Sequence, residues 1–203
     1  MKITIWSLKG GVGKTSIALN LALSCDCSII TNERYTLLDK VLSKENLLQL
    51  QVNQEVPILP INENVIFDMG GYSDKRIIGA CNQSRFILVP TTASDIDLQG
   101  CISTLIELKK FVDSDKIIII ANKINNESDF NKIKAIIEQI DNKYSFFEIK
   151  NSKALVNIYD EKKSINDIIK AGGLKSYSYK HIGKQFNNLI NFLNNNQVIS
   201  NDK

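Results

Sequence analysis

The sequence predicts a doubly wound α/β fold, in which helices cover both faces of a mostly parallel sheet. Short apolar segments alternate with helical segments along most of the 203 residues, and this alternation is typical of parallel sheets. A glycine-rich turn at residues 8–15 joins the first apolar segment to the first helical one, which is a common arrangement for binding phosphate. The length suits one substantial core. We therefore expect a single domain over residues 1–203, with a flexible Asn-rich tail at residues 194–203.

The first third of the chain contains three apolar runs of strand length. The third of them, at residues 64–68, reads as a buried strand that ends in an acid, Asp68. Pro57–Pro60 reads as a brief edge element, because its prolines exclude a central strand. We predict strands at residues 3–6, 27–31 and 64–68, and helices at residues 16–22 and 37–50.

The remaining two thirds continue the same alternation. An apolar strand at residues 85–89 is closed by Pro90, and four consecutive isoleucines make residues 116–121 the most strand-like segment. The helix between them has an apolar stripe at helical spacing, formed by Ile96, Leu98, Ile102, Leu105, Ile106 and Leu108. We also predict a helix at residues 133–140, a strand at 144–149, one or two short helices, and a long helix at 178–193.

The turn at residues 8–15 has the composition of a phosphate-binding loop. Gly10, Gly11 and Gly13 let successive backbone N–H groups converge on phosphate oxygens, and the following helix adds the positive end of its dipole. Lys14 would neutralise the β- and γ-phosphates, and Thr15 would place its hydroxyl on Mg²⁺. The alternative is an ordinary glycine turn, which the strand and helix on either side make less plausible.

Lys9, directly before the paired glycines, gives the Lys-Gly-Gly-Val-Gly-Lys-Thr pattern of the deviant Walker loop. The chain thereby resembles the ParA/MinD family of P-loop ATPases, and its length is most like that of the small plasmid-partition ParA proteins. The resemblance implies ATP and Mg²⁺ as cofactors and a homodimer formed around two ATP molecules, in which Lys9 contacts the partner's nucleotide. It implies catalytic roles for Lys9, Lys14 and Asp68. The implied nucleotide-binding residues are Lys9, Gly10, Gly11, Val12, Gly13, Lys14, Thr15, Ser16 and Asn122.

Asp68 is the second predicted site residue, because ligands in open α/β sheets bind at the carboxyl ends of the strands. A carboxylate there matches the Walker B position, so Thr15 and Asp68 are the expected Mg²⁺ residues. The alternative, Asp68 as the N-cap of a helix near Ser73, is weakened by the two glycines that follow it. Met69-Gly70-Gly71 resembles the loop that senses the γ-phosphate in ParA-like proteins.

One departure from the family concerns the end of the second strand. The family places an Asp-x-Asp pair there, whereas this chain has Asn32 in the first position and Glu33 displaced by one. An asparagine brings no charge and cannot accept a proton. Hydrolysis is therefore expected to be slow, or Glu33 substitutes; Asp39 is a more distant candidate.

The choice of nucleotide depends on the segment Asn122-Lys123-Ile124-Asn125, which comes close to the Asn-Lys-x-Asp motif that reads guanine. Guanine presents two donors, which a carboxylate accepts together, whereas Asn125 offers one acceptor and one donor. ATP is therefore the expected nucleotide. By resemblance Asn122 borders the adenine, and the segment Asn151–Asp160, with Lys153 and Tyr159, closes over the base.

Residues 150–203 carry nine lysines against four acidic residues, a net charge of +5 in a chain of net charge +3. Such a segment is either a set of solvated helix faces or a footprint for a phosphate backbone, and the ParA resemblance favours non-specific DNA. The candidate DNA-binding residues are Lys150, Lys153, Lys162, Lys163, Lys170, Lys175, Lys180 and Lys184. With a ParB-like partner that stimulates hydrolysis, the implied setting is cytoplasmic and nucleoid-associated.

The sequence also bears on three other function classes. A MinD-like membrane ATPase needs a basic amphipathic helix, but the polar residues among 186–193 are asparagines, which favours a packed helix. A metallocluster enzyme needs glycine-flanked cysteine pairs, which Cys81 and Cys101 do not match, and all four cysteines read as reduced. A nucleotide-dependent scaffold remains open because of Asn32. No stretch approaches the roughly 20 apolar residues that cross a bilayer, and no secretory signal is expected.

Overall fold

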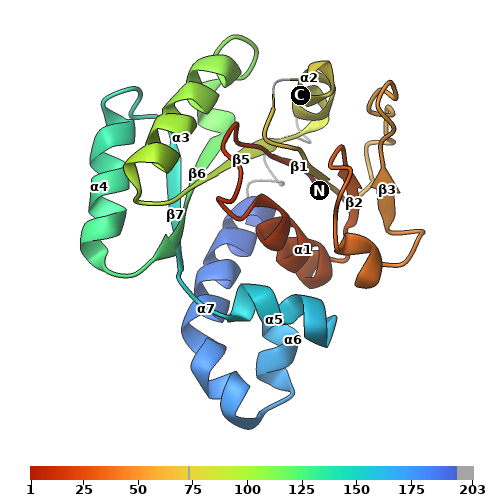
Figure 1. Ribbon diagram of the computed structural model, residues 1–203, viewed down its shortest axis with the longest axis vertical. Coiled ribbons are helices and arrows are strands. Elements are labelled where there is room, and N and C mark those ends of the chain that lie inside the picture. The colour runs from red at the N-terminus through yellow and green to blue at the C-terminus, as the bar shows by residue number, and fades with distance from the viewer. Residues whose placement is uncertain (73, 196–203) are drawn as a thin grey trace.

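The computed structural model describes residues 1–72 and 74–195. Seven parallel strands form one sheet in the order β3-β2-β4-β1-β5-β6-β7, and helices lie on both of its faces (Figure 1). The predicted α/β fold is thus confirmed. The strands are β1 (Lys2–Ile5), β2 (Ser28–Thr31), β3 (Leu47–Gln49), β4 (Val65–Asp68), β5 (Phe86–Thr91), β6 (Ile117–Ile124) and β7 (Ser145–Lys150). The α-helices are α1 (Lys14–Cys25), α2 (Lys75–Gln83), α3 (Asp95–Leu108), α4 (Glu127–Glu138), α5 (Ala154–Glu161), α6 (Ile165–Lys170) and α7 (Gly173–Asn195), with 3₁₀ turns η1 (Leu38–Lys40) and η2 (Ser114–Lys116).

Two apolar layers hold the sheet, one on each face. Strand β6 shows the principle, because Ile118 and Ile120 join the layer formed with α1, α5, α6 and α7, whereas Ile117 and Ile119 join the layer formed with α2, α3 and α4. Successive side chains of a strand point to opposite faces. A run of isoleucines is therefore what a strand covered on both sides requires.

The sheet topology places the glycine-rich turn at a switch point. Strand β1 pairs with β4 on one side and β5 on the other, so the strand order reverses around it. Ligands in doubly wound sheets bind at the carboxyl ends of strands where this reversal occurs. The turn after β1 and the segments after β2, β4 and β6 therefore meet at one edge.

The predicted helix over residues 37–50 is wrong. Only Leu38–Lys40 forms a helical turn, and Leu47–Gln49 is the edge strand β3. Its backbone is held by β2, since the N–H of Ile29 donates to the carbonyl of Asn46 (2.8 Å) and the N–H of Leu50 donates to that of Thr31 (2.8 Å). Pairing with an available strand edge outweighs the helical spacing of the leucines.

The two proline predictions also need correction. The segment Pro57–Pro60 is not a strand, because the side-chain amide of Gln83 binds the carbonyl of Pro57 and the N–H of Leu59 in place of a strand partner. Pro90 does not close β5 but lies inside it, opposite Ile120. On its other side β1 has already ended, with the N–H of Trp6 bonded to the carbonyl of Leu88. No neighbour requires the missing N–H of Pro90.

The buried face of α3 and the boundaries of α7 differ from those predicted. In α3 the stripe residues Ile96 and Ile106 are 72% and 57% exposed, while Cys101 is buried in their place. Helix α7 begins at Gly173, earlier than predicted, and includes Asn194 and Asn195 of the expected tail; residues 196–203 lie outside the described residues. None of the helices in residues 1–72 and 74–195 is long and apolar enough to cross a bilayer.

Candidate nucleotide site

The turn between β1 and α1 has the backbone of an anion-binding loop. Gly11 and Gly13 adopt φ angles of 80° and 96°, a region that favours glycine. Gly13 is the N-cap of α1 and offers no side chain to the first N–H groups of the helix. A Cβ at Gly13 would lie 2.3 Å from the amide nitrogen of Asn122. These N–H groups therefore remain available to an anion.

A cavity of about 460 Å³, here called the nucleotide cavity, opens over this turn. Its walls come from the turn between β1 and α1, the loops after β2 and β4, the end of β6, and the end of β7 with the segment that follows it. Its lining residues are Gly10, Gly11, Gly13, Lys14, Thr15, Ser16, Glu33, Gly71, Asn122, Lys123, Lys150, Asn151, Ser152, Leu155 and Val156. Of the predicted nucleotide-binding residues, Val12 has a buried side chain and does not line the cavity, and neither does Lys9.

Lys14 lies at the base of the nucleotide cavity and is 6% exposed. Its ammonium group donates to the carbonyl of Lys9 (3.2 Å). Burial lowers the pKa of Lys14, and the charges of Asp68 and Glu33 oppose part of that shift. A desolvated ammonium held beside the loop N–H groups is arranged to receive a phosphate.

Asp68 ends β4 and is 1% exposed, yet neither of its carboxylate oxygens has a hydrogen-bond partner among the described residues. Burial raises its pKa to about 6, while nearby Thr15 and Lys14 favour the charged form without supplying a hydrogen bond of normal geometry. Asp68 is not a helix N-cap, because the N-cap of α2 is Asp74, whose side chain accepts from the N–H of Arg76. Asp68 is thus an unpaired buried carboxylate, the kind of group that binds a cation.

These residues fit Mg²⁺. The described part of the chain contains no cluster of three or more His, Cys, Asp or Glu side chains that could hold a metal alone. A single carboxylate and a hydroxyl suit Mg²⁺, which usually takes its other ligands from water and substrate phosphates. Asp68 and Thr15 are the residues that would hold it.

The unpaired charge of Asp68 leads to a stability prediction. Asp68→Asn should raise the free energy of unfolding of the nucleotide-free protein by about 1–2 kcal/mol at neutral pH, because a neutral amide is cheaper to bury than a charge. The same change should remove the Mg²⁺-dependent part of ADP affinity. Urea unfolding measures the first effect, with Asp113→Asn, whose side chain is 79% exposed, as the control. A loss of stability in Asp68→Asn would contradict the prediction.

Lys9 lies outside its own nucleotide cavity, against α3. A Cβ on Gly100 would come within 2.7 Å of the Lys9 Cβ, so glycine makes room for this side chain. Among residues 1–72 and 74–195 the Lys9 ammonium has no ion pair or hydrogen bond. Its charge is therefore not balanced by any side chain of the described residues.

Asn122 and Lys123 support the loop from the end of β6. The amide of Asn122 donates to the carbonyl of Val12 (2.8 Å), and the ammonium of Lys123 donates to that of Gly11 (2.9 Å). The buried Oδ1 of Asn122 has no partner among the described residues. The sequence did not predict the contact of Lys123, because it depends on a left-handed backbone φ of 56°. This backbone angle turns the side chain toward the loop. The Oδ1 of Asn125 accepts from Asn151 (3.1 Å).

The segment after β7 contributes part of what the sequence predicted. Asn151 lines the nucleotide cavity, while Tyr159 places its hydroxyl 3.5 Å from that of Ser16. Lys153 is the N-cap of α5 and does not line the cavity. Ser152, Leu155 and Val156 belong to the same predicted segment and also line the cavity. The sequence did not mark them individually, since small and apolar residues have no phosphate chemistry of their own.

Asn32 and Glu33 are adjacent in the chain, but their side chains have different surroundings. Asn32 is 2% exposed; its Oδ1 accepts from the N–H of Gly70 (2.6 Å), and its Nδ2 donates to Asp74 (3.3 Å). The indole of Trp6 binds the carbonyl of Gly70 from the other side (3.1 Å). Asn32 is thus hydrogen-bonded to the loop after β4. Glu33 instead lines the nucleotide cavity, where its negative charge opposes the lowering of the Lys14 pKa by burial and adds to the rise of the Asp68 pKa that burial causes. Asp39 is exposed in η1 and lines no part of this cavity.

Residues 3–165 match the protein family described as the CobQ/CobB/MinD/ParA nucleotide binding domain. The chain belongs to this family. The match covers the phosphate loop, Asp68 and Asn122 together, so the resemblance drawn from Lys9 to Thr15 is confirmed at the level of the family. No curated protein matches the sequence.

Solved structures of this family share the fold. Apo McdA from Cyanothece is 17% identical, covering 92% of this chain and 96% of its own, with a TM-score of 0.63. A plasmid partition protein from Borrelia burgdorferi bound to AMPPNP is 17% identical, covering 91% and 97%, with a TM-score of 0.56. MinD from Pyrococcus horikoshii, complexed with Mg-ADP, is 13% identical, covering 94% and 97%, with a TM-score of 0.63.

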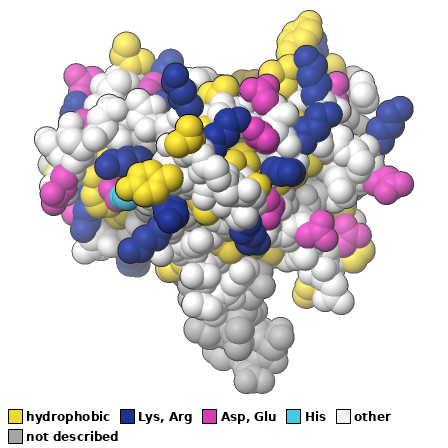
Figure 2. All heavy atoms as spheres, turned by 90° about the horizontal axis from the view of Figure 1, so that it is seen from below, with side chains coloured by type: hydrophobic (Ala, Val, Ile, Leu, Met, Phe, Trp, Pro, Cys, Tyr) yellow, Lys and Arg dark blue, Asp and Glu magenta, His cyan; other side chains and the backbone are white. Residues whose placement is uncertain are grey.

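The predicted DNA-binding lysines of this ParA/MinD-family chain do not form one uniform set. Lys150 lines the nucleotide cavity, Lys175 pairs with Glu161 (2.5 Å), and Lys170 lies 3.5 Å from Asp167. Lys180 lies 5.7 Å from the ring centre of Tyr177, which is 80% exposed. Figure 2 looks at the end of the molecule formed by α5, α6 and the start of α7, where basic side chains lie among acidic and apolar ones.

Proposed function

We propose that this chain is a ParA-type partition ATPase. ATP drives formation of a sandwich dimer, the dimer binds DNA without sequence specificity, and a ParB-like partner stimulates hydrolysis and release. The observation that carries this proposal is the loop from Lys9 to Thr15. Lys14 faces the protomer's own cavity, while the Lys9 ammonium lies outside it and has no partner in the part of the chain that the structure describes. Two nucleotides bound across one interface would make assembly a ligand-linked switch.

Within the site each residue has a distinct task. The loop N–H groups and Lys14 hold the phosphates, and Asp68 with Thr15 hold Mg²⁺, which when bound neutralises charge on the transferred phosphoryl group. Glu33 carries a carboxylate at the cavity wall that can accept a proton. The proposed setting is the cytoplasm, in association with the nucleoid.

Two alternative functions, a scaffold and a membrane ATPase, make different demands on the chain. A nucleotide-dependent scaffold is favoured by the neutral Asn32, and it would show dimerisation without turnover. A MinD-like membrane ATPase is not favoured, because Phe186, Leu189 and Leu193 of α7 are buried in the core, which leaves these residues unavailable to lipid.

The decisive experiment measures binding to a random DNA duplex at moderate salt, with ATP or with ADP. We expect binding by the wild type with ATP alone. Lys9→Ala should still bind nucleotide but should form no detectable dimer at concentrations where the wild type dimerises, and should not bind DNA. Lys40→Ala, which removes an exposed lysine outside the cavity, is the control. Retained ATP-dependent dimerisation by Lys9→Ala in light scattering would refute the role of Lys9 across the dimer.

The DNA surface has a separate test. Joint replacement of Lys175, Lys180 and Lys184 by glutamate should weaken duplex binding by about 10²-fold, because phosphate contacts dominate non-specific affinity, and should leave ATP-dependent dimerisation unchanged. All three residues are exposed on α7. The matched control reverses three exposed lysines elsewhere, Lys116, Lys134 and Lys143. Equal losses in the two triple variants would show that net charge alone, and not α7, determines binding.

A further inference from the structure

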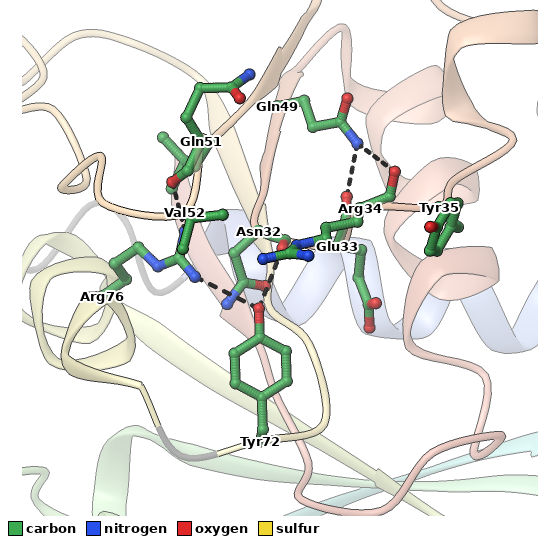
Figure 3. Close-up of a pocket in the computed structure, with 10 residues that line it drawn as sticks. Asn32, Glu33, Arg34, Tyr35, Gln49, Gln51, Val52, Tyr72 and Arg76 are labelled. Carbon is green, nitrogen blue, oxygen red and sulfur yellow. Dashed lines mark hydrogen bonds between the residues drawn. The ribbon is translucent and has the colours of Figure 1, made fainter.

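A second cavity, here called the β2–β3 pocket, lies at the carboxyl ends of these two strands (Figure 3). Its volume of about 540 Å³ exceeds that of the nucleotide cavity and falls in the range of small-molecule sites. The carboxyl edge of a parallel sheet is also where such sites form. Its lining residues are Asn32, Glu33, Arg34, Tyr35, Gln49, Leu50, Gln51, Val52, Tyr72 and Arg76.

Hydrogen bonds brace the walls of the β2–β3 pocket. The amide of Gln49 in β3 donates to the backbone carbonyls of Glu33 (2.7 Å) and Arg34 (2.9 Å), which fixes the segment after β2. The hydroxyl of Tyr72 donates to the carbonyl of Asn32 (3.2 Å) and ties the loop after β4 to the same segment. Three separate chain segments are thus joined, so a ligand would find a formed site and would lose little free energy to ordering it.

Arg76 belongs to this bracing. Its guanidinium pairs with Asp74 and donates to the carbonyl of Gln51 (2.9 Å) and to the hydroxyl of Tyr72 (3.4 Å). Its charge is therefore already balanced by a carboxylate, and most of its donors are occupied.

Arg34 differs in this respect. Among residues 1–72 and 74–195 its guanidinium has no ion pair and no hydrogen bond. In Figure 3 the side chain of Arg34 extends across the pocket toward Arg76 and Tyr72, while Glu33 turns its carboxylate away from it. An uncompensated guanidinium in a concave site favours a carboxylate or a phosphate, whose paired oxygens match its planar donors.

Side chains with apolar surface also line the β2–β3 pocket. Tyr35 is 96% exposed, Val52 is 59% exposed and Tyr72 is 46% exposed, and all three line the pocket. Aromatic rings in a binding site supply a large contact area together with a polar end. A ligand that satisfies both the charge and these rings combines an anionic group with a flat apolar body.

We propose that the β2–β3 pocket binds a small organic anion, whose carboxylate or phosphate pairs with Arg34 and whose apolar body lies against Tyr35, Val52 and Tyr72. This pocket is distinct from the nucleotide cavity: the two share Glu33 as a lining residue and, among the described residues, no other. It does not depend on ATP hydrolysis or on dimerisation.

The test uses phenyl phosphate and benzoate as probes, with neutral benzyl alcohol for comparison, in ligand-observed NMR titrations. The phosphate loop could also bind these anions, so the titrations are run with saturating ADP and Mg²⁺. They are repeated in Lys14→Ala protein, which keeps the result independent of nucleotide binding. We expect saturable binding of at least one anion and binding at least about tenfold weaker in Arg34→Gln, as expected for loss of a charge-assisted contact.

The matched control is Lys40→Gln, which removes one positive charge from exposed η1 outside the pocket and should leave the affinity unchanged. Tyr35→Ala should weaken binding without any change of charge. Stronger binding of phenyl phosphate assigns a phosphate ligand, and stronger binding of benzoate assigns a carboxylate. Absence of saturable binding to the wild type, equal losses in Arg34→Gln and Lys40→Gln, or equal affinity for benzyl alcohol would overturn the proposal.

Discussion

Replacing Lys14 with alanine is expected to weaken Mg-ADP binding by about 10²-fold or more. The ammonium of Lys14 is nearly buried, and within residues 1–72 and 74–195 its one hydrogen-bond partner is the Lys9 carbonyl. Charge-assisted hydrogen bonds in such surroundings contribute about 1.5–3 kcal/mol each. The alanine variant loses this contact and also removes the positive side chain that, in the part of the chain that the structure describes, offsets the charges of Asp68 and Glu33 beside the phosphates, so that Mg²⁺ alone would offset them.

The matched control is Lys123→Ala. Lys123 lines the same cavity and donates to Gly11, but it is exposed, so we expect no more than about a fivefold loss in affinity. Isothermal titration measures both variants, and circular dichroism checks that they remain folded. Unchanged ADP affinity in Lys14→Ala would contradict the assignment of the phosphate loop.

The site was predictable from the sequence wherever a residue's chemistry and its place at the end of a strand agree. The loop from Gly10 to Thr15 needs glycines at left-handed positions, and Gly11 and Gly13 adopt such angles. Asp68 ends a strand buried on both faces, so its carboxylate had to lie at the ligand-binding edge. Local pattern and global fold require the same residues there.

Prediction failed where a partner distant in the sequence decides the structure. The leucines of residues 37–50 have helical spacing, but Leu47–Gln49 pairs with the edge of β2 as a parallel strand. Pro90 is tolerated inside β5 because β1 has already turned away. The role of Asn32 depends on Gly70 and Asp74, which only the folded chain brings beside it. Such contacts leave no periodic signal in the sequence.

The second large effect is expected at Glu33. Glu33→Gln should lower the turnover of ATP by about 10²-fold, the usual contribution of a positioned acid or base, while ADP affinity stays within about threefold of the wild type. Glu33 is the carboxylate that lines the nucleotide cavity and can therefore reach a bound nucleotide. Asp68 is buried and is assigned to Mg²⁺, and Asn32 does not line the cavity. A steady-state phosphate-release assay measures the change.

Asn32→Asp provides the discriminating comparison. If the chain lacked only an acid at this position, restoring it would raise turnover. The structure leads to the opposite expectation, because an aspartate would lose the donor to Asp74 and place two carboxylates side by side in a nearly buried site. We therefore expect Asn32→Asp to cost about 1–3 kcal/mol in stability and not to increase hydrolysis. Faster hydrolysis by this variant, with Glu33→Gln still active, would assign the missing acid to position 32. Glu33 would then line the cavity without a role in hydrolysis.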